Sequence, residues 1–144
     1  MSDENVRIVC DNLIKLKQND IHTEITTLIV PSKNDSEIEL ENIVKFIKEN
    51  LGVDTPWHIS AFHPDYKELD ISRTSDESLT LAFDIAKSYG LNYVYRGNSD
   101  FNNSTYCKSC GEELISRKYF NVLKNSIRNS SCPKCGTKVD GVFS

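Results

Sequence analysis

Two pairs of cysteines near the carboxyl end most constrain what this chain can fold into. Cys107 and Cys110 form one C-x-x-C motif, and Cys132 and Cys135 form a second, with 21 residues between the pairs. A glycine follows each pair and accepts the positive φ that a tight turn around a metal ion can need. Four thiolates at this spacing favour a closed tetrahedral Zn²⁺ site with Zn–S bonds of about 2.3 Å. An iron–sulfur cluster held by the same cysteines is the alternative.

The cysteine-rich segment, residues 106–144, is too short to fold on an apolar core alone, so we expect the bound metal to be its main source of stability. The fifth cysteine, Cys10, lies on an apolar helical stripe and is interpreted as a small core residue. Between the two cysteine pairs, several apolar residues are expected to form a small hairpin layer around the metal: Leu114, Ile115, Tyr119, Phe120, Val122 and Leu123.

A step in charge divides the chain near residue 97. Residues 1–97 hold 17 acidic and 10 basic side chains, whereas residues 98–144 hold 4 acidic and 7 basic ones. The stretch GNSDFNNST at the step is rich in Asn, Ser and Gly, as linkers are. We therefore predict an α/β domain at 1–97, a linker at 98–105 and a zinc-ribbon-like domain with four cysteine ligands at 106–144. The small positive excess of the second part argues against nucleic acid as its partner.

Neither a membrane span nor a secretory signal is predicted. The chain has no run of 18 apolar residues, which is about the shortest helix that crosses a bilayer. Its acidic start, MSDENVRIVC, lacks the basic and then apolar layout of a signal peptide. We therefore expect a cytoplasmic protein, and in that compartment cysteines are more often metal ligands than disulfides.

Residues 1–97 contain three units of a helix followed by a strand. The helices are indicated by apolar residues at three- and four-residue spacing, and the strands by runs of β-branched residues. Two helices begin with capping boxes, Ser36–Glu39 and Thr74–Glu77, and end near Gly52 and Gly90. The strands are expected at 22–30, 57–62 and 92–96, and the apolar stripes are Val6, Val9, Cys10 and Leu13, then Leu40, Ile43, Val44, Ile47 and Leu51, then Leu79, Ala82, Phe83 and Ala86.

This alternation predicts parallel strands joined by helical crossovers. The pattern fits both a small three-layer α/β domain and a segment of a (β/α) barrel. In either fold, ligands bind at the carboxyl ends of the strands, which here are followed by loops 31–36, 63–70 and 97–100. His63, in the segment WHISAFHPDY, is therefore a candidate binding residue. His58 is interpreted as a packed or hydrogen-bonded interior residue, and His22 as a structural or solvated one.

Five segments of the chain carry a family resemblance in their order and spacing: LIVPSKNDSEIELENIVKFIKENLG, TPWHISAFHPDYKELD, AKSYGLNYVYRGN, TYCKSCGEELISR and CPKCGTKVDGVF. Together they resemble the C-terminal half of the AmmeMemoRadiSam radical SAM enzymes, which are similar to pyruvate formate-lyase activating enzymes. The resemblance implies a (β/α)₆ partial TIM barrel, of which the present strands match the last three. It also implies that S-adenosylmethionine is cleaved reductively at a [4Fe–4S] cluster to give a 5′-deoxyadenosyl radical. His63 matches a histidine close to bound S-adenosylmethionine, and Asn34 and Asn98 match residues of the neighbouring strand-end loops.

The chain departs from this family where the iron–sulfur cluster would bind. It has no C-x-x-x-C-x-x-C motif and no glycine-rich segment after a second strand. The resemblance therefore implies a gene fragment, a split protein or a C-terminal piece that is inactive alone. Its partner would be an N-terminal half-barrel, with which the cluster and S-adenosylmethionine would bind, and Memo-like and AMMECR-like proteins are partners by family association.

The alternative function is a non-catalytic zinc-ribbon module that recruits protein or nucleic acid. An independent zinc hydrolase is disfavoured, because four thiolate ligands leave no open coordination position.

Overall fold

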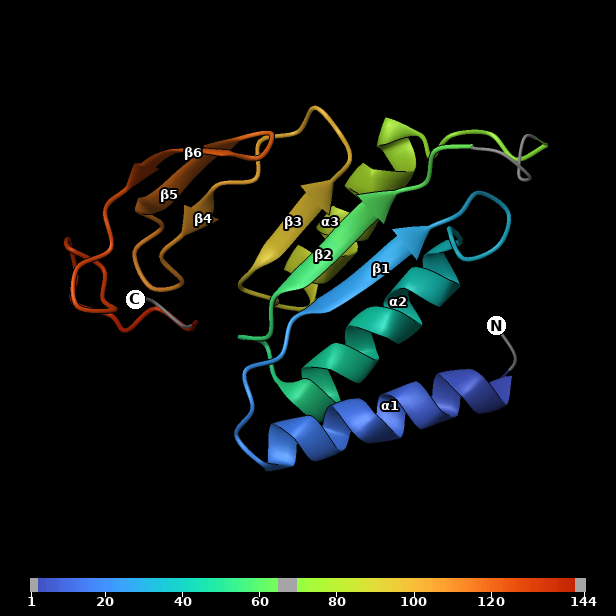
Figure 1. The fold of residues 1–144 in the computed structure, drawn as a ribbon, viewed down its shortest axis with the longest axis horizontal. Helices are drawn as coiled ribbons and strands as arrows, with labels where there is room; N and C mark the ends of the chain where they lie inside the picture. The colour runs from blue at the N-terminus through green and yellow to red at the C-terminus, as the bar shows by residue number, and fades with distance from the viewer. Residues whose placement is uncertain (1–2, 65–69, 142–144) are drawn as a thin grey trace.

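A computed structural model describes residues 3–64 and 70–141. Within them, the first three strands form a parallel sheet in the order β1-β2-β3, and the last three form an antiparallel sheet in the order β4-β5-β6 (Figure 1). The predicted α/β class is confirmed, and no closed barrel is formed by the part of the chain described. The elements are α1 (Asp3–Gln18), β1 (Ile25–Ile29), α2 (Glu37–Phe46), the π-helical turn η1 (Ile47–Leu51), β2 (Trp57–Ala61), α3 (Asp76–Ser88), β3 (Val94–Gly97), β4 (Thr105–Tyr106), β5 (Glu113–Lys118) and β6 (Asn121–Asn125).

The second helix begins and ends as its sequence predicts. Ser36 Oγ accepts from the Glu39 N–H at 3.4 Å, which is the N-cap bond of a capping box. The Glu39 carboxylate accepts from the Ser36 hydroxyl at 2.6 Å rather than from the backbone N–H that completes such a box. The helix continues into η1 and stops at Gly52, whose φ of 96° is open to glycine. The Gly52 N–H donates to Ile47 O at 2.8 Å and closes the wide π turn, which the sequence does not announce.

The predicted capping box at Thr74 is wrong by one residue. Ser75 is the N-cap of α3, and its Oγ accepts from the Ser78 N–H at 3.1 Å. Thr74 is buried, with 2% of its surface exposed. Its Oγ1 donates to Ile29 O at 2.6 Å and accepts from the Phe62 N–H at 2.7 Å. The threonine therefore joins the carboxyl ends of β1 and β2, and the neighbouring serine is left to cap the helix.

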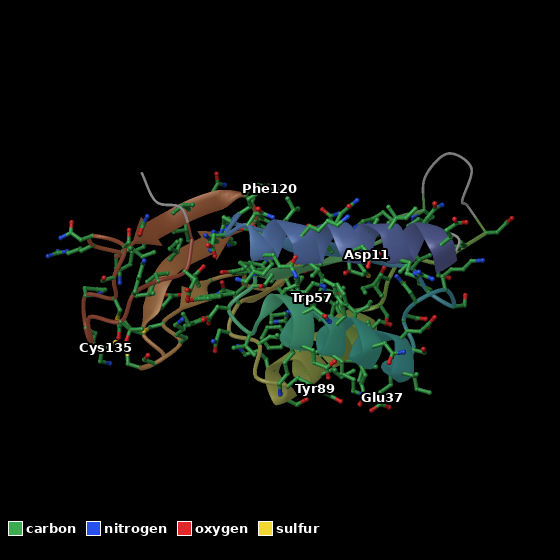
Figure 2. The ribbon with its side chains drawn as sticks, turned by 90° about the horizontal axis from the view of Figure 1, so that it is seen from below. Asp11, Glu37, Trp57, Tyr89, Phe120 and Cys135 are labelled. Atoms are coloured by element: carbon green, nitrogen blue, oxygen red, sulfur yellow. The ribbon has the colours of Figure 1, made fainter. Side chains whose placement is uncertain are left out.

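The parallel sheet has one covered face and one open face. α2 and α3 lie on the same side of the sheet, as Figures 1 and 2 show, and pack against alternate residues of its strands. Trp57 is fully buried there, and its Nε1–H donates to Thr27 Oγ1 at 2.9 Å. The residues on the other side of the strands are exposed or half-buried, and we call this side the open face: Thr26, Leu28, His58, Ser60, Tyr95 and Gly97.

The apolar stripe of α1 is less buried than the sequence predicts. Val6 and Val9 are 45% and 49% exposed, and Cys10 is only half-buried, so the interpretation of Cys10 as a core residue is wrong. Leu13 alone of the four stripe residues packs against the core. The reason is position: α1 contacts η1 and does not lie over the sheet (Figure 1).

The antiparallel sheet has a small core of its own, formed by Cys107, Leu114, Ile115, Cys132 and Val139. The expected hairpin layer is thus correct for Leu114 and Ile115. It is wrong for the residues at and beyond the β5–β6 turn, because the hairpin extends past the cysteines into solvent. Phe120 is 95% exposed, and Tyr119, Val122 and Leu123 are also exposed. None of the helices in the described residues is long and apolar enough to cross a membrane.

Candidate functional site

The two cysteine pairs fold into matching turns. In the first, the Cys107 N–H donates to Glu112 O at 2.8 Å, and the Gly111 N–H donates to Cys107 O at 2.9 Å. Cys132, Gly136 and Thr137 repeat this pattern, with both distances at 2.9 Å. Gly111 and Gly136 have φ angles of 72° and 75°, as their position after each pair predicts.

These turns bring the four sulfurs together. The Sγ atoms of Cys107, Cys110, Cys132 and Cys135, which we call the four-cysteine group, all lie within 4.8 Å of one another. Cys107 and Cys135 are 3.6 Å apart, and Cys110 and Cys132 are 3.7 Å apart. A tetrahedral ion with bonds of about 2.3 Å sets neighbouring sulfurs about 3.8 Å apart. A disulfide would instead need about 2 Å. The four cysteines therefore fit a bound metal ion, and they are the only such group in the residues described.

The surroundings of two of the thiols shift their pKa values in opposite directions. For Cys110, the backbone N–H of Glu112 lowers the pKa, but desolvation and the hydrogen bonds of the other three thiols outweigh it and raise the pKa to about 12. For Cys135, the hydroxyl and N–H of Thr137 lower the pKa to about 6. One sulfur therefore ionises readily, while complete ionisation of the group is opposed until a cation is present.

The predicted binding residues of the α/β part lie at the other end of the sheet, where its strands finish. His63 Nε2 donates to Asn98 O at 3.2 Å, so these two exposed residues meet. Asn34 is occupied locally: its side chain accepts from the Val30 N–H at 2.7 Å and donates to Leu28 O at 2.9 Å. The structure thus joins two of the three and gives Asn34 a role in ending β1. Residues 65–69 of the predicted loop lie outside the described residues.

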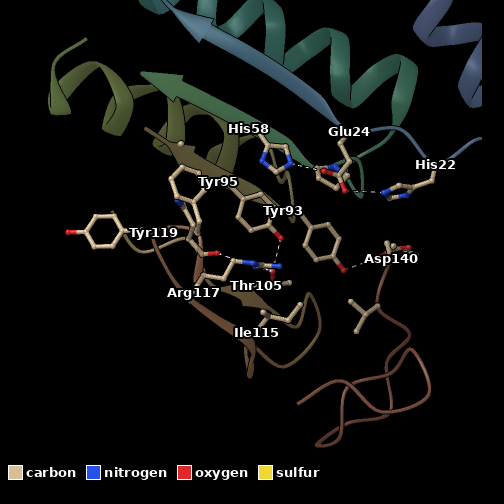
Figure 3. Close-up of a pocket in the computed structure, with 16 residues that line it drawn as sticks. His22, Glu24, His58, Tyr93, Tyr95, Thr105, Ile115, Arg117, Tyr119 and Asp140 are labelled. Carbon is tan, nitrogen blue, oxygen red and sulfur yellow. Dashed lines mark hydrogen bonds and ion pairs between the residues drawn. The ribbon is translucent and has the colours of Figure 1, made fainter. Parts of the chain in front are cut away.

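A carboxylate between two histidines lies at the opposite, amino-terminal end of the open face (Figure 3). Glu24 Oε2 accepts from His58 Nε2 at 2.8 Å, and Glu24 Oε1 accepts from His22 Nε2 at 3.1 Å. Desolvation raises the pKa of Glu24, but the hydrogen bonds from His22 and His58 outweigh it, so that the pKa lies below its usual value of 4.5. The hydrogen-bonded role predicted for His58 agrees with this geometry, but its side chain is 37% exposed, so the prediction of an interior residue is wrong.

The glutamate and histidines form part of a groove between the open face and β5. The groove has a volume of about 520 Å³, and its walls include Tyr95 from β3 and Arg117 from β5. The His58 and Tyr95 rings stack with their centroids 5.0 Å apart. Neither Glu24 nor Arg117 was identified from the sequence. The pattern His22-x-Glu24 before a strand is the one signal that points to this cluster, and its meaning depends on His58 from another strand.

Comparisons with known proteins place this chain beside a longer one. No family model matches it. Over 131 residues it is 41% identical to the uncharacterized protein MJ0808 of Methanocaldococcus jannaschii. The match covers 88% of this chain and 39% of the relative, so the chain spans about two fifths of the relative's length.

Proposed function

We propose that this chain is the C-terminal half of a radical SAM barrel, which acts only when an N-terminal half-barrel completes it. The single observation that carries the proposal is the sheet. Its order, β1-β2-β3, follows the chain, and both crossover helices lie on the same side. A doubly wound sheet reverses its order and places helices on both faces, whereas a (β/α) barrel keeps sequential order with all helices outside.

The open face supports the same proposal. Parallel sheets are normally covered on both sides, yet Thr26 and Leu28 are exposed, and Ser60 and Gly97 are half-buried. In a barrel this face would line the interior. β1 is also paired on one side only within the described residues, and further strands would extend the sheet from that edge. The relative from M. jannaschii has additional chain from which such strands can come, since this match accounts for 39% of it.

The chemistry of the proposal comes from the family resemblance. His63 and Asn98 would face S-adenosylmethionine at the carboxyl ends of β2 and β3, and their mutual contact supports a common site. The [4Fe–4S] cluster would be bound by a C-x-x-x-C-x-x-C motif in the other half. We assign Zn²⁺ to the four-cysteine group because its four soft donors leave no position for substrate.

The test is assembly of the two halves. The chain is co-expressed with a half-barrel polypeptide that carries C-x-x-x-C-x-x-C and, separately, with the remainder of the M. jannaschii relative. We expect a stable complex that, after anaerobic reconstitution and reduction, converts S-adenosylmethionine to 5′-deoxyadenosine. His63→Ala should weaken S-adenosylmethionine binding, while His22→Ala, at the other end of the sheet, should not. A complex that forms but yields no 5′-deoxyadenosine would contradict the proposed reaction.

A second candidate function, a non-catalytic recruitment module, is favoured by the exposed β5–β6 hairpin. Phe120 is 95% and Leu123 66% exposed, beside Lys118 and Lys124. A module of this kind would bind its partner with or without the half-barrel. If nucleic acid is that partner, retention should weaken steeply as salt rises.

A further inference from the structure

The groove between the open face and β5 has the composition of a ligand site. We propose that it binds a small organic acid with one planar ring, whose acid group lies on Arg117 and whose ring lies against Tyr95 and the β5–β6 turn. The lining of the groove includes none of the four cysteines and not His63, and the proposal stands without the half-barrel.

Arg117 provides the seat for the acid group. Its Nη1 donates to Thr105 Oγ1 at 2.7 Å and to Asn103 O at 3.2 Å. These bonds hold the guanidinium carbon 5.7 Å from the centre of the Tyr95 ring. No carboxylate of the described residues forms an ion pair with it. The remaining N–H groups can bind a planar acid group in the forked geometry that guanidinium prefers.

The acidic side chains around the groove already have partners. Glu24 is bonded to both histidines, at 3.1 and 2.8 Å. Asp140 accepts from Lys108 at 2.6 Å and from the Tyr93 hydroxyl at 3.1 Å. Among the charged side chains that the structure describes in the groove wall, Arg117 alone has no oppositely charged or imidazole partner. The groove should therefore bind an anion rather than a cation.

Aromatic side chains provide the seat for the ring. The Tyr95 ring stacks on the His58 ring, with an angle of 24° between the two ring planes. A 2.8 Å hydrogen bond between the Tyr95 and Thr105 hydroxyls also holds it in place. Tyr119 and Phe120 also line the groove and are 60% and 95% exposed. Contact between aromatic rings and the burial of their surface from water both lower the free energy of binding. A ring that enters the groove covers this aromatic surface.

The groove has room for a single-ring acid. Its volume of about 520 Å³ lies within the range for small-molecule sites. A metal ion at Glu24 is not supported, since the four cysteines alone have metal-binding geometry among the residues described. The occupant that fits both seats is thus a compact aromatic acid.

The proposal is tested with the zinc-loaded chain, residues 1–144, and three probes. Benzoate has a ring and an acid group, benzyl alcohol has the ring alone, and acetate has the acid group alone. Binding is followed by ¹H–¹⁵N and aromatic NMR shifts. We expect benzoate to shift the NMR signals of the Arg117 Nε–H, Tyr95 and Phe120. Its affinity should be at least about tenfold higher than that of benzyl alcohol or acetate. If none of the probes shifts these signals, or if benzoate binds no better than acetate and benzyl alcohol, the proposal is wrong.

Two variants locate the seats. Arg117→Gln should reduce benzoate binding about tenfold, whereas Arg128→Gln, an arginine outside the groove, should leave it unchanged. Phe120→Ala should weaken benzoate severalfold, and because its side chain is almost fully exposed, the variant should fold normally. If Arg117→Gln loses zinc or structure, Phe120→Ala decides: weaker binding supports the ring seat, and unchanged binding overturns it.

Discussion

Lys108 Nζ lies 2.7 Å from Asp54 Oδ2, so a residue inside the first cysteine turn is joined to the loop before β2. The same Nζ is 2.6 Å from Asp140 Oδ2, which follows the second turn. Asn92 Nδ2 donates to Asp54 Oδ1 at 2.6 Å and fixes the carboxylate from the sheet side. The turn that carries Cys107 and Cys110 and the loop before β2 are therefore joined by one ionic network.

Removal of Lys108 should loosen this junction. We expect Lys108→Ala to lower the free energy of unfolding by about 1 kcal/mol, because it removes two partly exposed ion pairs. Lys134→Ala is the matched control, since Lys134 pairs with Glu112 within the cysteine-rich segment and is 64% exposed. Urea unfolding of both variants measures the difference. Equal effects would mean that the bridge to Asp54 contributes nothing.

The metal should hold the antiparallel sheet together. We expect one zinc per chain and a colourless protein by elemental analysis and visible absorption. Cys132→Ser or a strong chelator should abolish the NMR dispersion of β4–β6, because a five-residue core is too small to fold alone. Trp57, the single tryptophan and fully buried among α2 and α3, reports separately on the parallel sheet and should change little. Brown protein that contains iron would contradict the assignment of zinc.

Thr74 should be more costly to replace than the true helix cap beside it. Thr74→Val keeps the volume but leaves the Phe62 N–H without its bond and removes the bond to Ile29 O. We expect Thr74→Val to lower the free energy of unfolding by about 1–3 kcal/mol. Ser75→Ala should lower it by about 1 kcal/mol. Denaturant unfolding followed by Trp57 fluorescence ranks the two. A larger loss for Ser75→Ala would show that the buried hydroxyl is dispensable.

Glu24 should remain ionised to lower pH than an ordinary glutamate. The hydrogen bonds from His22 and His58 place its pKa below 4.5 in the folded protein. A lowered pKa stabilises the folded protein at pH values above the pKa of glutamate in the unfolded chain. This stabilisation is lost as the pH falls through the pKa of the folded protein. An NMR titration of the Glu24 carboxyl carbon measures it directly, and His58→Ala should move the pKa upward. A wild-type value at or above 4.5 would refute this account.

Several features of the fold were predictable because they depend on residues close together in the chain. The Ser36 cap of α2 and the Gly111 and Gly136 turns are formed by backbone and side chains within a few residues of one another. Thr74 shows the limit of such patterns. It has the sequence of a cap, and yet its hydroxyl bonds Ile29 O, 45 residues away. The stripe of α1 fails for a similar reason, since periodicity indicates an apolar side but not what covers it.

By itself the sequence determined the two cysteine turns, the helices and the parallel strands, because spacing and apolar period act through local hydrogen bonds and burial. Only the tertiary structure decided what surrounds Glu24 and Lys108. The strand register that pairs Thr26 with His58 brings Glu24 to His58, which is 34 residues away in the chain. The packing of the second sheet brings Lys108 to Asp54, which is 54 residues away. Contacts at such separations depend on how whole elements pack, and no short pattern of residues encodes that.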